Sequence, residues 1–121
     1  RRSRTNTPLQ ALALLNGPQF VEAARHLAER MLIEGGQTLN ERITYGFRLV
    51  TARIPGQSEL ALLRSAYTEN LQHFGANKAA AHKLLQVGDS PYNTSLNISK
   101  LAAMTSVARL LFNLNETVTK G

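Results

Sequence analysis

Apolar residues recur along most of the chain with the period of an α-helix, and turn residues separate the periodic segments. The clearest segment is 18–34, where one helical face is apolar and the other is polar. The apolar positions are Phe20, Val21, Ala24, Leu27, Ala28, Met31 and Leu32. The polar positions are Glu22, Arg25, His26, Glu29 and Arg30. We expect the apolar face to be buried and the polar face to be exposed to solvent.

The same periodicity predicts five further helices, over residues 7–16, 38–52, 57–74, 78–87 and 98–114. Two of them begin with a capping box, in which Thr7 is followed by Gln10 and Thr38 by Glu41. Asn77 and Asn97 stand at cap positions as well. The helix over 98–114 has only a narrow polar strip, so we expect it to be central to the core.

No segment of useful length alternates between apolar and polar residues with a period of two, so we expect no strand. Residues 88–95 combine glycine, proline, aspartate, asparagine and serine, which is typical of a loop. The predicted fold class is therefore all-α: a small orthogonal or irregular bundle of about six helices without a sheet.

Length and charge divide the chain into two parts. A chain of 121 residues fits one domain, and 43% hydrophobic against 18% charged residues is a globular composition. The formal net charge is +6, and Arg1, Arg2 and Arg4 contribute half of it. We therefore expect a basic strip or linker over residues 1–6 and a single helical domain over 7–121. Because the chain opens on arginine rather than methionine, we interpret it as a fragment of a longer protein.

Several kinds of site are excluded by composition. Without cysteine, the chain cannot form disulfides, thiolate zinc sites, iron–sulfur ligation or covalent haem attachment. No apolar run approaches the roughly 20 residues that a membrane span requires. His26, His73 and His82 lack a histidine partner three or four residues away. We therefore expect no metal and no cofactor in this fragment.

The N-terminal strip is the most distinctive polar segment. Arg1, Arg2 and Arg4 carry three guanidiniums, and Thr5 and Asn6 add hydrogen-bonding groups. One interpretation is an arm that contacts an anion or a protein partner. The other interpretation, which we favour, is a linker that leads into the first helix cap.

One loop offers a conceivable reactive group. Asp89 and Ser90 are adjacent in the loop, and His82 lies upstream as a possible base. The same residues are ordinary turn formers, which is the interpretation that we favour. The chain is therefore not expected to be an enzyme by itself, and we assign no catalytic residue.

The residues also resemble a known family. Residues 1–25, which include RRSRTNTPLQALALLN, are similar to the closing part of a domain of unknown function. That domain is abundant in planctomycetes and sits beside planctomycete cytochrome-c-like domains. Residues 47–55 resemble the family's arginine–proline joint, 87–91 its loop, and 101–116 its final helix and tail. Met104 stands where the family has tryptophan, and Asn115 where it has aspartate.

The resemblance implies a C-terminal piece of an exported, extracytoplasmic, multi-domain bacterial protein whose upstream domains are its partners. Our leading hypothesis is a non-catalytic structural or interaction module. A second is an anion-binding module that uses the arginine strip to hold acidic polysaccharide or nucleic acid. Few aromatic residues are available for base stacking, so nucleic acid is the less favoured of these ligands. A third is a fragment of an enzyme whose site lies upstream. The fragment could also self-associate through its apolar first helix.

Overall fold

The computed structural model of the protein describes the backbone of residues 17–120 and the side chains of residues 17–114. These residues form five helices and contain no strand, which confirms the all-α prediction for this part of the chain. The helices are α2 (Pro18–Glu34), α3 (Leu39–Thr51), α4 (Gln57–Ala76), α5 (Lys78–Leu85) and α6 (Ile98–Lys120). The predicted helix over 7–16 and the arginine strip lie outside the described residues.

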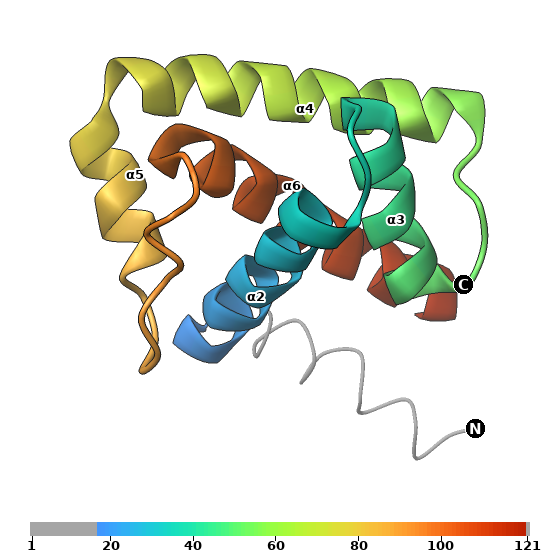
Figure 1. Cartoon of the computed structure of the whole chain (residues 1–121). Helices are drawn as coiled ribbons and strands as arrows, with labels where there is room; N and C mark the ends of the chain where they lie inside the picture. Colours follow the sequence, from blue (N-terminus) through green and yellow to red (C-terminus); the bar gives the residue numbers. More distant parts are fainter. Residues whose placement is uncertain (1–16, 121) are drawn as a thin grey trace.

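The described helices are arranged around α6, which lies beneath α4 and is crossed by α2 (Figure 1). In that view α4 lies along the top, α2 and α3 run beneath it, and α5 closes one end of the molecule. Helix α6 packs against all four of the other helices, most extensively against α2 and α4. It is therefore the central element that its narrow polar strip predicted, and it supplies seven core residues with no exposed surface. These are Leu101, Ala102, Ala103, Met104, Val107, Ala108 and Leu111.

The apolar face of α2 is buried at every predicted position, so the helical periodicity identified this face correctly. This face of α2 packs closely against α3 at one point. Gly46 of α3 faces Met31 of α2, and a Cβ atom built at Gly46 would lie 2.5 Å from the Met31 Sδ. Only a residue without a side chain lets the two helices approach to this distance.

The predicted caps set most of the helix starts. Thr38 Oγ1 accepts from the Glu41 N–H at 3.1 Å, and Glu41 Oε1 accepts from the Thr38 N–H at 3.0 Å. Asn77 and Asn97 accept from the backbone N–H of Ala80 and Lys100. These contacts satisfy donors that the first turn of a helix leaves without partners.

The helix ends differ more from the predictions than the starts. Helix α4 continues to Ala76 rather than 74, and α6 continues to Lys120 rather than 114. The additional residues, 75–76 in α4 and 115–120 in α6, include no proline, which would have stopped either helix. Helix α5 ends at Leu85 rather than 87, because Val87 donates to the Leu84 carbonyl and Gly88 turns the chain at φ +101°.

Candidate functional site: the Arg25 network

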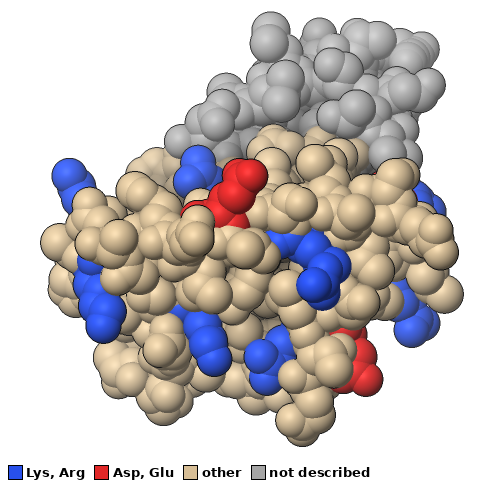
Figure 2. Space-filling view, turned by 90° about the horizontal axis from the view of Figure 1, so that it is seen from above, with Lys and Arg blue, Asp and Glu red and all other residues tan. Residues whose placement is uncertain are grey.

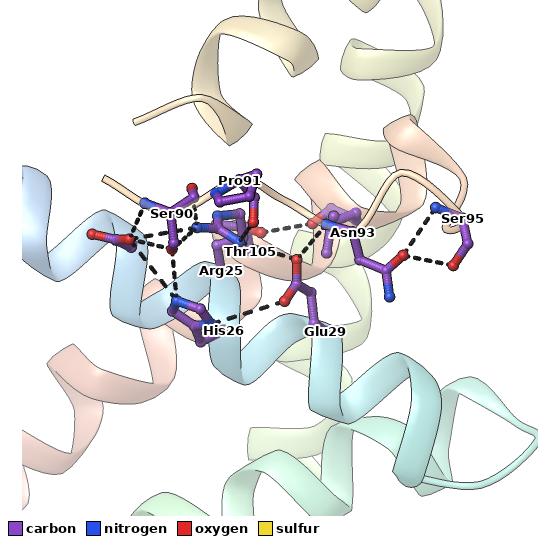
Figure 3. Close-up of polar contacts among 10 residues, drawn as sticks. Arg25, His26, Glu29, Ser90, Pro91, Asn93, Ser95 and Thr105 are labelled. Carbon is purple, nitrogen blue, oxygen red and sulfur yellow. Dashed lines mark hydrogen bonds and ion pairs between the residues drawn. The ribbon is translucent and has the colours of Figure 1, made fainter. Parts of the chain in front are cut away.

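The loop between α5 and α6 folds back onto the polar face of α2, where it meets a buried arginine. Arg25 is only 1% exposed, so the prediction that it faces solvent was wrong. Its Nη2 donates to the carbonyl of Ser90 at 2.9 Å and to Ser90 Oγ at 2.8 Å. Its Nη1 donates to the Pro91 carbonyl at 3.2 Å and to Glu29 Oε2 at 3.1 Å. Figure 3 shows Arg25 reaching from α2 into this loop.

Two carboxylates on α2 complete the contact with the loop. Glu22 accepts from the backbone N–H of Asp89 at 3.2 Å and of Ser90 at 2.8 Å, and also from the Ser90 hydroxyl. Glu29 Oε2 accepts from the Asn93 N–H at 2.8 Å. We call Glu22, Arg25, Glu29 and Ser90 the Arg25 network. The three α2 residues are spaced i, i+3 and i+7, so they form one stripe along the helix.

The network neutralises the charge that it buries. Arg25 forms ion pairs with Glu22 at 3.7 Å and with Glu29 at 3.1 Å. Two loop carbonyls and one hydroxyl accept its remaining contacts. A buried guanidinium is tolerated only when it is paired and hydrogen-bonded in this way. Its Nε is the one buried side-chain nitrogen or oxygen without a hydrogen-bond partner in the described part of the chain.

The environment holds Glu22 in its charged form. Its pKa falls from 4.5 to about 2, mainly because the Ser90 hydroxyl donates to it. The backbone N–H groups of Ser90 and Asp89 lower the pKa further, burial opposes them, and the positive charge of Arg25 adds a smaller lowering. A carboxyl group with so low a pKa is a weak base, which is unfavourable for a role in proton abstraction.

Glycine allows the loop to approach this carboxylate. Gly88 has φ +101°, a conformation that other residues rarely adopt. A Cβ atom at Gly88 would lie only 2.4 Å from Glu22 Oε1. Both its backbone conformation and its close contact with Glu22 therefore require glycine at the start of the loop.

Ser90 lies beside a histidine, but not the one considered from the sequence. His26 Nε2 is 3.1 Å from Ser90 Oγ, whereas His82 Nδ1 contacts the Tyr92 hydroxyl at 2.8 Å. A serine hydroxyl has one proton and two lone pairs. Here the proton goes to Glu22, and Arg25 and His26 both approach the oxygen.

The geometry does not form a catalytic triad. His26 Nδ1 is 3.9 Å from Glu29 Oε1, which is too long for the hydrogen bond that orients a catalytic histidine. The Ser90 hydroxyl donates its proton to Glu22 and accepts from Arg25, so its proton and one of its lone pairs are already used within the network. Two hollows of about 340 and 360 Å³ both border Gly88 and Asp89, and Asp89 itself is exposed. The arrangement is suited to holding the loop rather than to turnover.

The structure adds no support for the other candidate sites. The strip residues Arg1, Arg2, Arg4, Thr5 and Asn6 fall outside the described range, so no contact can be assigned to them. Over residues 17–114, no three histidine, aspartate or glutamate side chains converge as metal ligands. None of the helices α2 to α6 is long and apolar enough to cross a membrane.

Comparison with known proteins gives one match. The family model described as PSD1, protein of unknown function (DUF1553), matches residues 1–67. The match covers α2, α3 and the first half of α4, and so includes the α2 side of the Arg25 network. No curated protein and no solved structure matches the chain. Because the matched segment is more than half of the 121 residues, the chain belongs to the PSD1 (DUF1553) family of proteins of unknown function.

Proposed function

We propose that this chain is a non-catalytic structural or interaction module of a larger protein. The observation that carries the proposal is the state of Ser90, whose hydroxyl is engaged by Glu22, Arg25 and His26 at once. The groups that a hydrolytic site would need are instead used to fix a loop to α2. A module of this kind contributes a stable surface rather than a reactive group.

The setting of the module forms the second part of the proposal. We place it at the C-terminal end of an exported, extracytoplasmic protein of planctomycete type, with cytochrome-c-like or other domains upstream as its partners. This placement rests on the resemblance of residues 1–25, 47–55, 87–91 and 101–116 to that family. In this setting any redox or hydrolytic chemistry belongs to the other domains.

Substitutions at the Arg25 network in the full-length protein test the proposal. Ser90→Ala removes the hydroxyl while keeping the loop length, and Thr94→Ala changes an exposed residue of the same loop as a control. Ser90→Ala should lower the thermal midpoint, because Glu22 and Arg25 each lose a partner, at a cost of roughly 1–3 kcal/mol. His26→Ala and Ser90→Ala should both leave any turnover unchanged. Loss of turnover at normal stability in either variant would overturn the proposal.

The alternative function is an anion-binding module. Figure 2 shows the face over α4, where lysine and arginine side chains are more numerous than carboxylates but spread apart. An anionic polysaccharide would then bind through charge, and the arginine strip would add to the affinity. Replacing Arg1, Arg2 and Arg4 with glutamine should weaken binding to heparin and flatten its dependence on salt. Unchanged affinity in this variant would exclude the strip as the binding element.

A further inference from the structure

One face of α3 is not covered by any other described helix and borders a hollow of about 680 Å³. All but one of the residues that line it come from α3 or its end, at helical spacing. They are Gly35, Asn40, Glu41, Thr44, Tyr45, Arg48, Leu49 and Ala52. Leu49 is 46% exposed although it is a large apolar residue. This surface, which we call the α3 face, lies apart from the Arg25 network.

The α3 face carries two opposite charges, and neither forms an ion pair among residues 17–114. Glu41 and Arg48 are seven residues apart, about 10.5 Å along one side of the helix. Both side chains are exposed, and Arg48 forms no ion pair with any carboxylate among residues 17–114. Glu41 uses Oε1 to accept from the backbone N–H groups of Gln37 and Thr38, and its side chain is exposed. The face therefore presents one negative and one positive charge at opposite ends.

We propose that the α3 face binds the α3 face of a second copy of this chain in antiparallel orientation. A two-fold axis that passes between Thr44 and Tyr45 brings Glu41 of each copy level with Arg48 of the other. The two ion pairs form at the two ends of the contact, and Thr44 and Tyr45 meet near the axis. This is the self-complementary pattern that a two-fold symmetric interface requires.

Two further observations support this choice of partner. Tyr45 is already held in place, because it donates to Glu34 and accepts from Arg30 Nη2 at 3.1 Å. It therefore loses little side-chain freedom on association. Leu49 lies beside Arg48 and would be covered by the partner helix. A contact of about three helical turns is smaller than the roughly 800 Å² per partner of a standard interface, so the dimer should be weak and concentration-dependent.

Sedimentation of charge-reversed variants tests the pairing. Parent chain should associate as its concentration rises, whereas Arg48→Glu alone should be monomeric, because glutamates then face each other. Glu41→Lys alone should also be monomeric. An equimolar mixture of the two variants should associate, because every facing pair is again of opposite charge. A parent chain that stays monomeric, or a mixture that does not associate, would overturn the proposal.

Two controls separate loss of the interface from loss of the fold. Glu41→Lys also removes half of a capping box, so circular dichroism must show that the variant is folded. Glu41→Gln keeps a side chain that can complete the box and removes only the charge, and it should weaken association without unfolding α3.

Cross-linking tests the position of the axis. Since the chain has no cysteine, a Thr44→Cys variant carries a single thiol at the centre of the α3 face. A short bismaleimide should link two such chains efficiently. The matched control is Ser65→Cys on the exposed side of α4, which should link poorly. Equal linking of the two variants would mean that a different surface mediates association and would contradict the proposal.

Discussion

At the scale of single residues, Arg25 does the most to hold the loop in place. Its guanidinium connects α2 to the backbone of residues 90 and 91 and pairs with two carboxylates. The planar fork donates in several fixed directions, which a lysine ammonium cannot reproduce. The position of the loop therefore depends on the shape of this side chain as well as on its charge.

Replacing Arg25 should destabilise the domain strongly. Arg25→Ala leaves Glu22 and Glu29 partly buried without their cation, and such changes cost about 3–5 kcal/mol. Arg64 is a matched control, because it is exposed and, among residues 17–114, donates only to Asn40. Arg64→Ala should cost less than about 1 kcal/mol. Urea unfolding of both variants measures the difference, and equal losses would show that Arg25 contributes no more than a surface arginine.

Glu22 should make stability depend on acid pH. Its pKa is about 2 in the folded chain against 4.5 for the free side chain, so folding favours the ionised form. That stabilisation is complete above pH 4.5 and is lost as the pH falls toward 2. In Glu22→Gln, the decline in urea midpoint between these pH values should be shallower. A decline as steep as that of the parent chain would show that Glu22 is not the group responsible.

At the scale of helices, packing distances decide which glycines matter. Gly46 in α3 lies against Met31, which has no exposed surface, whereas nothing stands within 4 Å of a Cβ placed on Gly75 in α4. Alanine is the better helix former by about 1 kcal/mol where space allows. The same substitution should therefore have opposite effects at these two positions.

Gly46→Ala should destabilise the chain, because a Cβ would lie 2.5 Å from the Met31 sulfur and would force the two helices apart. Overpacking of this kind costs about 1–3 kcal/mol. Gly75→Ala should instead stabilise by about 0.5–1 kcal/mol, since its Cβ enters open space. Thermal melts of the two variants make the comparison. Shifts of the same sign would contradict it.

The elements also show where sequence reasoning succeeds. Helix starts and the apolar face of α2 could be predicted because caps and periodicity act over a few residues. The burial of Arg25 could not be predicted in this way, because the loop that covers it lies 65 residues away in the chain. The available signal was the stripe of Glu22, Arg25 and Glu29, in which an arginine lies between two acids beside the apolar face. Periodicity by itself assigns any such polar residue to solvent.

At the scale of the whole molecule, α6 makes the fold one cooperative unit. It contacts every other helix among residues 17–120, so the separation of any of these helices from the rest breaks contacts with α6. The described part of the chain should therefore unfold in a single transition. The three tyrosines can report this, because Tyr45 is in α3, Tyr67 is in α4 and Tyr92 is in the loop before α6.

Met104→Ala tests this cooperativity at the centre of α6. The side chain has no exposed surface, so its truncation should cost about 2–5 kcal/mol and leave a cavity. Leu110 on the same helix is 39% exposed and provides the control, with a smaller loss expected for Leu110→Ala. In Met104→Ala the tyrosine fluorescence and the far-ultraviolet circular dichroism should still change together, at a lower temperature. If the fluorescence changed first, α3 and α4 would be separating from a helical remainder, and α6 would not be the element that unites them.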